Sequence, residues 1–236
     1  MKYRLNRAIA ATGYCSRRKA DELIAQGRVK VNDKLTTDFS FEVDPDLDDL
    51  QVDGQNISVK KFEYILMYKP PGIVTTCEDE YGRRNVIDLL PVEVRHVRPV
   101  GRLDLDSEGL LILTNDGELA QGLAHPSNHV FKRYEVTVSG DITSAALARM
   151  ASGIELEEGK TLPAKVRLIK KAGRNSRFEI SIREGRNRQI RRMCAALGYP
   201  VVRLVRVAIG ALQLRQLKPG EWRRLTAEEL QSLRAK

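Results

Sequence analysis

The spacing of apolar residues changes repeatedly near the N-terminus, and this pattern constrains the fold of that segment more than any other feature. Residues 5–12 place apolar side chains three and four positions apart, which predicts a short amphipathic helix. A second helix is expected over residues 17–26, with Ser16 as its N-cap. Residues 28–31 then alternate charged and apolar side chains before a tight turn at Asn32-Asp33. We therefore expect a helix–turn–helix–hairpin module.

The charge of this module changes sign along the chain. Residues 1–34 hold nine basic and three acidic residues, whereas residues 38–53 hold seven acidic residues and no basic one. Arg17, Arg18 and Lys19 gather at the start of the second helix, where the helix dipole adds to the attraction for phosphate. The whole chain carries a formal net charge of +9, which favours a polyanionic partner such as nucleic acid. A solvated basic face is the alternative.

The cysteines and the N-terminus indicate a cytoplasmic location. Cys15, Cys77 and Cys194 are odd in number and far apart, so they form neither a disulfide framework nor a zinc site. The polar start, residues 1–6, does not resemble a signal peptide. No apolar run approaches the roughly 20 residues that a membrane span needs. We expect a cytoplasmic protein that does not bind membranes.

A larger unit is expected to follow the N-terminal module. Strands are predicted at residues 64–68, 73–76, 110–114, 134–138, 164–169 and 178–182, and helices near residues 117–123, 144–152, 188–197 and 227–234. This mixture predicts an α+β fold with a mostly antiparallel central sheet flanked by helices. We place the domains at residues 1–60 and 61–236.

An acid-rich loop at residues 101–109 leads directly into a buried strand. Asp104, Asp106 and Glu108 have the spacing that opens an EF-hand calcium loop, but Asn115 stands where that loop needs its bidentate Glu, and a strand follows instead of a helix. His96, His125 and His129 are scattered, and Pro126 argues against a histidine pair on one helical face. We predict no metal site, and no phosphate-loop signature is present.

The stretch at residues 101–117 reads GRLDLDSEGLLILTNDG. It resembles a motif of RNA pseudouridine synthases, in the branch that includes RsuA, RluB and RluF, and two further motifs of the chain resemble that family. The resemblance implies that Asp104 is the catalytic residue and that Arg102 takes the place of the base that is turned out of the RNA. The alternative is that Asp104 is a carboxylate that only stabilises a turn or a cap, without a catalytic role.

The second and third motifs lie at residues 131–136, FKRYEV, and residues 184–193, EGRNRQIRRM. In the family, a tyrosine of the second motif packs against the target base, which implies this role for Tyr134. The arginine of the third motif pairs with the catalytic aspartate, which implies Arg186, although its neighbours stay open as candidates. The other arginines of this helix start are expected to bind RNA: Arg188, Arg191 and Arg192.

The N-terminal module resembles an S4 domain, an RNA-binding module of a ribosomal protein and of several RNA-modifying enzymes. That resemblance implies that five of its basic residues face RNA phosphates: Arg7, Arg17, Arg18, Lys19 and Arg28.

Together these resemblances imply an enzyme that isomerises a specific uridine in ribosomal RNA, presented in a structured region or a single-stranded loop. The chain looks most like the RluB-type enzymes of the large subunit (23S), while small-subunit (16S) or RluF-type specificity stays open. A non-catalytic RNA-binding factor for ribosome assembly is the alternative from another class. The isomerisation requires no cofactor, and we expect a monomer. Asp104 could attack either the sugar or the base.

Overall fold

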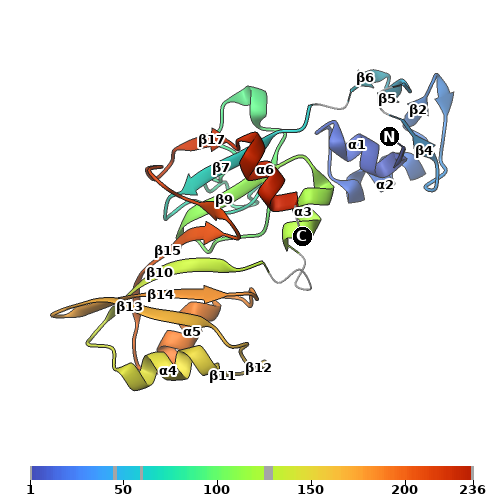
Figure 1. Ribbon diagram of the computed structural model, residues 1–236. Coiled ribbons are helices and arrows are strands. Elements are labelled where there is room, and N and C mark those ends of the chain that lie inside the picture. The colour runs from blue at the N-terminus through green and yellow to red at the C-terminus, as the bar shows by residue number, and fades with distance from the viewer. Residues whose placement is uncertain (1, 45–46, 59–60, 125–129, 235–236) are drawn as a thin grey trace.

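The computed structural model describes residues 2–44, 47–58, 61–124 and 130–234. Figure 1 shows a small N-terminal part of helices and short strands, and a larger part built on one long sheet. The strands of the small part end at Ile57 and the long sheet begins at Tyr64. Residues 59–60 lie outside the described residues, so the boundary between residues 60 and 61 stays a proposal.

The N-terminal part has the expected helix–turn–helix–hairpin order. Its elements are β1 (Tyr3–Arg4), α1 (Leu5–Ala11), α2 (Arg17–Ala25), β2 (Val29–Val31), β3 (Lys34–Leu35), β4 (Glu42–Val43), β5 (Leu50–Val52) and β6 (Gln55–Ile57). The Ser16 hydroxyl accepts a hydrogen bond from the Lys19 N–H at 3.2 Å, so the predicted cap is confirmed. Asn32 and Asp33 adopt φ values of 49° and 62°, the left-handed backbone that a tight hairpin turn requires.

The larger part is organised around a long, mostly antiparallel sheet, as predicted. In the described residues its strand order is β13-β14-β10-β15-β9-β7-β17, with β16 paired to β15 and β8 to β9. The strands are β7 (Tyr64–Lys69), β8 (Arg98–Pro99), β9 (Glu108–Thr114), β10 (Lys132–Ser139), β13 (Lys165–Ala172), β14 (Asn175–Ile182), β15 (Val201–Ile209), β16 (Leu212–Gln213) and β17 (Trp222–Arg224). β11 (Glu155–Leu156) and β12 (Gly159–Lys160) form a separate ribbon. Only β9 and β15 run parallel within this described sheet.

Burial on both faces explains the continuous apolar runs of β7 and β9. All seven residues of β9 are buried, and alternate side chains enter two different cores. Leu110 and Ile112 pack with the helices α3 (Gly117–Ala124) and α6 (Ala227–Arg234). Leu111 and Leu113 pack on the opposite face with the segment that contains the 3-10 helix η1 (Val92–Val94). A strand buried on both faces loses the polar–apolar alternation of a half-exposed strand.

A third core covers the other half of the sheet. Helices α4 (Ser144–Ser152) and α5 (Gln189–Ala196) pack against β10 and β14, and Figure 1 shows both helices beside these strands. No helix of the described residues is long and apolar enough to cross a membrane.

The sheet differs from the sequence prediction at residues 73–76 and in β15, and its short strands β8, β16 and β17 were not predicted either. Residues 73–76 are not a strand; in the described chain this segment forms a single isolated bridge, from Val74 to Asn85. Strand β15, at the centre of the sheet, was not predicted. Its arginines, Arg203 and Arg206, interrupt the apolar pattern that marks a buried strand.

Candidate active site

A cavity of about 550 Å³ opens where residues 100–107, strands β10 and β15, and residues 182–190 meet. Asp104 and Tyr134 both line it, although they lie in different elements and far apart in sequence. Tyr134 is 8% exposed and pairs across the sheet with Arg206 of β15. The fold therefore brings the carboxylate and the aromatic ring named in the sequence analysis to one cavity.

The loop that carries Asp104 is held by Lys69, the last residue of β7. Its buried ammonium group donates hydrogen bonds to the backbone oxygens of Asp104 at 3.1 Å, Ser107 at 2.8 Å and Pro70 at 3.0 Å. Burial lowers the pKa of Lys69 to about 8, although the nearby carboxylates, first that of Asp104, oppose this decrease. Because these contacts reach the main chain, they fix the loop and leave the Asp104 side chain free to face the cavity.

Arg206 ties together the two ends of the same loop. Its Nε donates to the Leu110 oxygen at 2.7 Å and its Nη1 to the Arg102 oxygen at 3.4 Å. The residue is only 3% exposed and lines the cavity, and its Nη2 has no hydrogen-bond partner among the described residues. A buried cation of this kind adds positive potential beside Asp104.

The other two carboxylates of the loop are already bound by arginines. Asp106 accepts hydrogen bonds from Arg188 at 2.8 and 3.1 Å, and these hold the pKa of Asp106 below its usual range. Although burial opposes it, the pKa of Glu108 is also lowered, by hydrogen bonds from Arg203 and Tyr68. The calcium-like spacing of the sequence therefore produces arginine pairs and not a shared ligand set.

Arg186 does not pair with Asp104, contrary to the expectation. Its guanidinium donates to the Glu184 carboxylate at 3.2 Å and to the backbone oxygens of Gly159 and Lys160 at 2.6 and 2.8 Å. These contacts join the β11–β12 ribbon to the start of the third motif. Because its two terminal nitrogens donate to this ribbon while its Nε donates to Glu184, Arg186 organises the wall of the cavity in the described structure.

Arg188 and Arg191, which were expected to bind RNA, contact the Asp104 loop in the described structure. Arg191 donates to the Asp106 backbone oxygen at 2.9 Å and to the Ser107 hydroxyl at 3.3 Å, and its Nε lies 3.4 Å from the Asp106 carboxylate. The Asp104 charge also acts on Arg188, whose pKa is raised first by its hydrogen bond to Asp106. Arg192 pairs with Glu158 at 2.7 Å. All three guanidiniums are thus engaged within the protein.

Two family models match the chain. Residues 63–196 match the family model described as RNA pseudouridylate synthase, and residues 4–49 match the S4 domain model. The chain belongs to the RNA pseudouridine synthase family. It is therefore an isomerase that acts on RNA, with an S4 domain ahead of its catalytic domain.

Relatives of this synthase cover nearly its whole length. The ribosomal large subunit pseudouridine synthase B of Bacillus subtilis is 43% identical over 98% of this chain and 96% of the relative. The protein of the same name from Vibrio cholerae is 38% identical over 99% of this chain and 75% of the relative. A crystal structure of a pseudouridylate synthase matches with a TM-score of 0.71 and 31% identity, covering 98% of this chain and 99% of the other.

The basic residues of the synthase's S4 domain are not equally available to RNA. Arg7 pairs with Glu118 of α3 at 2.8 Å, so its guanidinium joins the S4 domain to the catalytic domain. Arg28 pairs with Asp53 at 2.6 Å, and Lys19 with Glu22 at 2.7 Å. The remaining two expected residues of this domain are exposed and have no ion pair in the described chain: Arg17 and Arg18.

Two buried cations of the synthase's site, Lys69 and Arg206, were not predicted from the sequence. Lys69 precedes Pro70-Pro71-Gly72, which indicated only a turn, and Arg206 lies in the strand that was not predicted. The described residues hold no group of three or more possible metal ligands, and His125 and His129 lie outside them.

Proposed function

We propose that this synthase converts a uridine of large-subunit ribosomal RNA into pseudouridine, with Asp104 as the nucleophile. The observation that carries the proposal is the cavity that Asp104 and Tyr134 share, beside a loop held by Lys69 and Arg206. The names of the Bacillus and Vibrio relatives support the choice of large-subunit RNA. The enzyme would act as a monomer.

The reaction exchanges one bond of the uridine for another. The N1–C1′ bond breaks, C1′ joins C5 of the same base, the proton on C5 leaves, and N1 gains a proton. The target base must first leave its stack, which costs a few kcal/mol. Asp104 would hold the reacting nucleotide covalently, through the sugar or the base, while the base turns. Tyr134 would pack against the base, and the exposed Arg102 could fill the space that it leaves.

Mapping pseudouridines in ribosomal RNA tests the substrate. Cells that lack the protein are expected to lose one pseudouridine from 23S rRNA, and a plasmid copy of the wild-type gene is expected to restore it. Loss of a 16S site would move the proposal to the small subunit. An unchanged pseudouridine map in both RNAs would overturn it.

The Arg191 contacts predict a role in turnover. Arg191→Lys keeps the charge but cannot reach Asp106 and Ser107 together, so the loop that carries Asp104 should lose its alignment. We expect kcat to fall about 10- to 100-fold, while the Kd for RNA changes less than about threefold. Tritium release from RNA that contains 5-tritiated uridine measures kcat, and filter binding measures Kd.

Arg192→Lys is the matched control, because Arg192 bonds to Glu158 and to the Asn187 oxygen and has no contact with the Asp104 loop. It should keep most of the activity. Equal losses of turnover and affinity in Arg191→Lys would place this arginine on a phosphate instead.

The free arginines of the S4 domain predict a change in salt dependence. Replacing both Arg17 and Arg18 by Gln removes two possible phosphate contacts, so the slope of log affinity against log salt should flatten by roughly 1.4–1.8 units. Filter binding over a range of salt concentrations measures the slope. The same charge is removed from the catalytic domain by Arg149→Gln with Lys170→Gln, two exposed residues that do not line the cavity. If both double variants flatten the slope equally, the effect belongs to net charge and not to this helix.

A further inference from the structure

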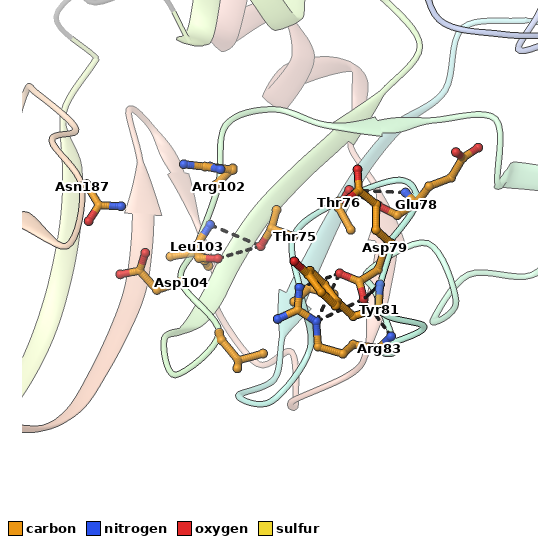
Figure 2. Close-up of a pocket in the computed structure, with 13 residues that line it drawn as sticks. Thr75, Thr76, Glu78, Asp79, Tyr81, Arg83, Arg102, Leu103, Asp104 and Asn187 are labelled. Atoms are coloured by element: carbon orange, nitrogen blue, oxygen red, sulfur yellow. Dashed lines mark hydrogen bonds and ion pairs between the residues drawn. The ribbon is translucent and has the colours of Figure 1, made fainter.

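A second cavity, of about 430 Å³, lies on the other side of the Asp104 loop. Residues 74–83 form one wall, and the loop residues Arg102–Leu105 form the other (Figure 2). Arg102, Leu103, Asp104 and Asn187 line both this cavity and the larger one that contains Tyr134. The two cavities are therefore neighbours, with Asp104 on the ridge between them.

An exposed tyrosine stands in the wall of the second cavity. Tyr81 is 80% exposed, although an aromatic ring gains from leaving water. The Arg83 guanidinium lies 5.1 Å from the centre of the ring, and Arg83 is itself paired with Asp79 at 2.7 Å. Asp79 also accepts hydrogen bonds from the N–H groups of Tyr81 and Arg83, at 3.2 and 2.8 Å. The turn thus holds the ring in an exposed position, where a ligand can contact it.

The charges around Tyr81 indicate what kind of ligand fits. Asp79 is neutralised by Arg83, but Glu78 and Glu80 line the cavity as exposed carboxylates. They would repel a phosphate, whereas a neutral planar group can stack on the ring. In a protein that acts on RNA, a nucleobase is the planar group available, and stacking on an aromatic side chain tolerates any base.

Hydrogen bonds connect the wall of the second cavity to the Asp104 loop. The Thr75 hydroxyl donates to the Leu103 oxygen at 2.8 Å and accepts from the Leu103 N–H at 3.3 Å, and Figure 2 shows both contacts. The Gly72 N–H donates to the Leu105 oxygen at 2.8 Å. A base bound against residues 74–83 is therefore held at a fixed position relative to Asp104.

We propose that the second cavity binds the nucleobase next to the target uridine, stacked on Tyr81. The RNA strand then crosses the ridge at Arg102–Asp104 with one base in each cavity. Stacking of the neighbouring base on Tyr81 offsets part of the free energy that is needed to move the target uridine out of its stack in the RNA. This inference rests on the proposed function for the choice of RNA.

A double-mutant cycle between Tyr81 and the neighbouring base tests the inference. The probe is a synthetic RNA that spans the modified uridine of 23S rRNA, with either neighbour intact or replaced by an abasic ribose. On intact RNA, Tyr81→Ala should raise KM about 5- to 150-fold, the range of one lost base stack, and leave kcat within about threefold. Tyr81→Phe keeps the ring, so its KM should stay within about twofold of wild type.

The abasic RNA separates a base stack from any other role of Tyr81. At one of the two neighbouring positions, the abasic ribose should raise the KM of the wild-type enzyme as much as Tyr81→Ala raises it on intact RNA. The same abasic RNA should not raise the KM of Tyr81→Ala any further. The inference would be overturned if the KM increases from Tyr81→Ala and from the abasic ribose were additive at both positions. An unchanged KM in Tyr81→Ala would also overturn it. If wild type isomerises neither 23S nor 16S rRNA, the proposed function fails. Filter binding to the 23S transcript then decides this inference alone, because an equal Kd for wild type and Tyr81→Ala overturns it.

Discussion

Asp104→Asn is expected to reduce turnover by about 10⁴-fold or more, because an amide cannot act as the nucleophile that the proposed reaction needs. The substitution preserves the shape of the side chain, and the contacts that hold the loop reach the Asp104 backbone oxygen, which asparagine keeps. We therefore expect RNA affinity within about threefold of wild type and an unchanged melting temperature. Tritium release from 5-tritiated uridine measures turnover, and filter binding measures affinity.

Asp106→Asn is the matched control, two residues away on the same loop. Asp106 pairs with Arg188 and Arg191, so its neutralisation should loosen the loop and reduce turnover only partly. Activity near the wild-type level in Asp104→Asn would remove Asp104 from its role. A larger loss in Asp106→Asn than in Asp104→Asn would transfer the role to its neighbour.

Gly109→Ala is expected to destabilise the catalytic domain by roughly 3–5 kcal/mol. A Cβ at this position would lie 2.3 Å from the Arg206 oxygen and 2.7 Å from the Arg206 nitrogen, where β9 and β15 meet in parallel. The φ angle of +110° adds strain for any residue with a side chain. Neither strand can yield without separating the loop of Asp104 from the strand of Arg206, so activity should fall with stability.

The single tryptophan offers a suitable measurement, because Trp222 lies in β17 of the same sheet. Urea unfolding followed by its fluorescence gives the unfolding free energy of the catalytic domain. Gly220→Ala is the control, since Gly220 has a φ of +89° but no atom within 4 Å of its added Cβ. It should cost roughly 1–2 kcal/mol. Equal losses in the two variants would mean that backbone strain alone, and not the contact with Arg206, explains the effect.

Local patterns in the sequence predicted most elements of the fold. The helix spacing of residues 5–12 and 17–26, the Ser16 cap and the Asn32-Asp33 turn depend on interactions between residues a few positions apart, so they are visible before any tertiary structure forms. The predicted strand at residues 73–76 was wrong. Ile73 packs instead in the core beneath an irregular segment, a use of an apolar side chain that periodicity does not separate from a strand.

The motifs, through family resemblance, named Asp104 and Tyr134 as candidates, and the fold places both at one cavity. Neither the periodicity nor the spacing of residues could show which cations support the loop. Lys69 is buried because backbone oxygens of residues 104 and 107 arrive from a distant segment to accept its hydrogen bonds.

The choice among the arginines of the third motif depended on the tertiary structure for the same reason. Arg186 and Arg191 are five positions apart, yet one contacts the β11–β12 ribbon and the other the Asp104 loop. The sequence by itself, with the family resemblance of its motifs, predicted the two-domain organisation, most of the local elements and the candidate carboxylate. Only the tertiary structure decided the partners of each buried charge, because a charge is stable in the interior only where distant segments supply its hydrogen bonds.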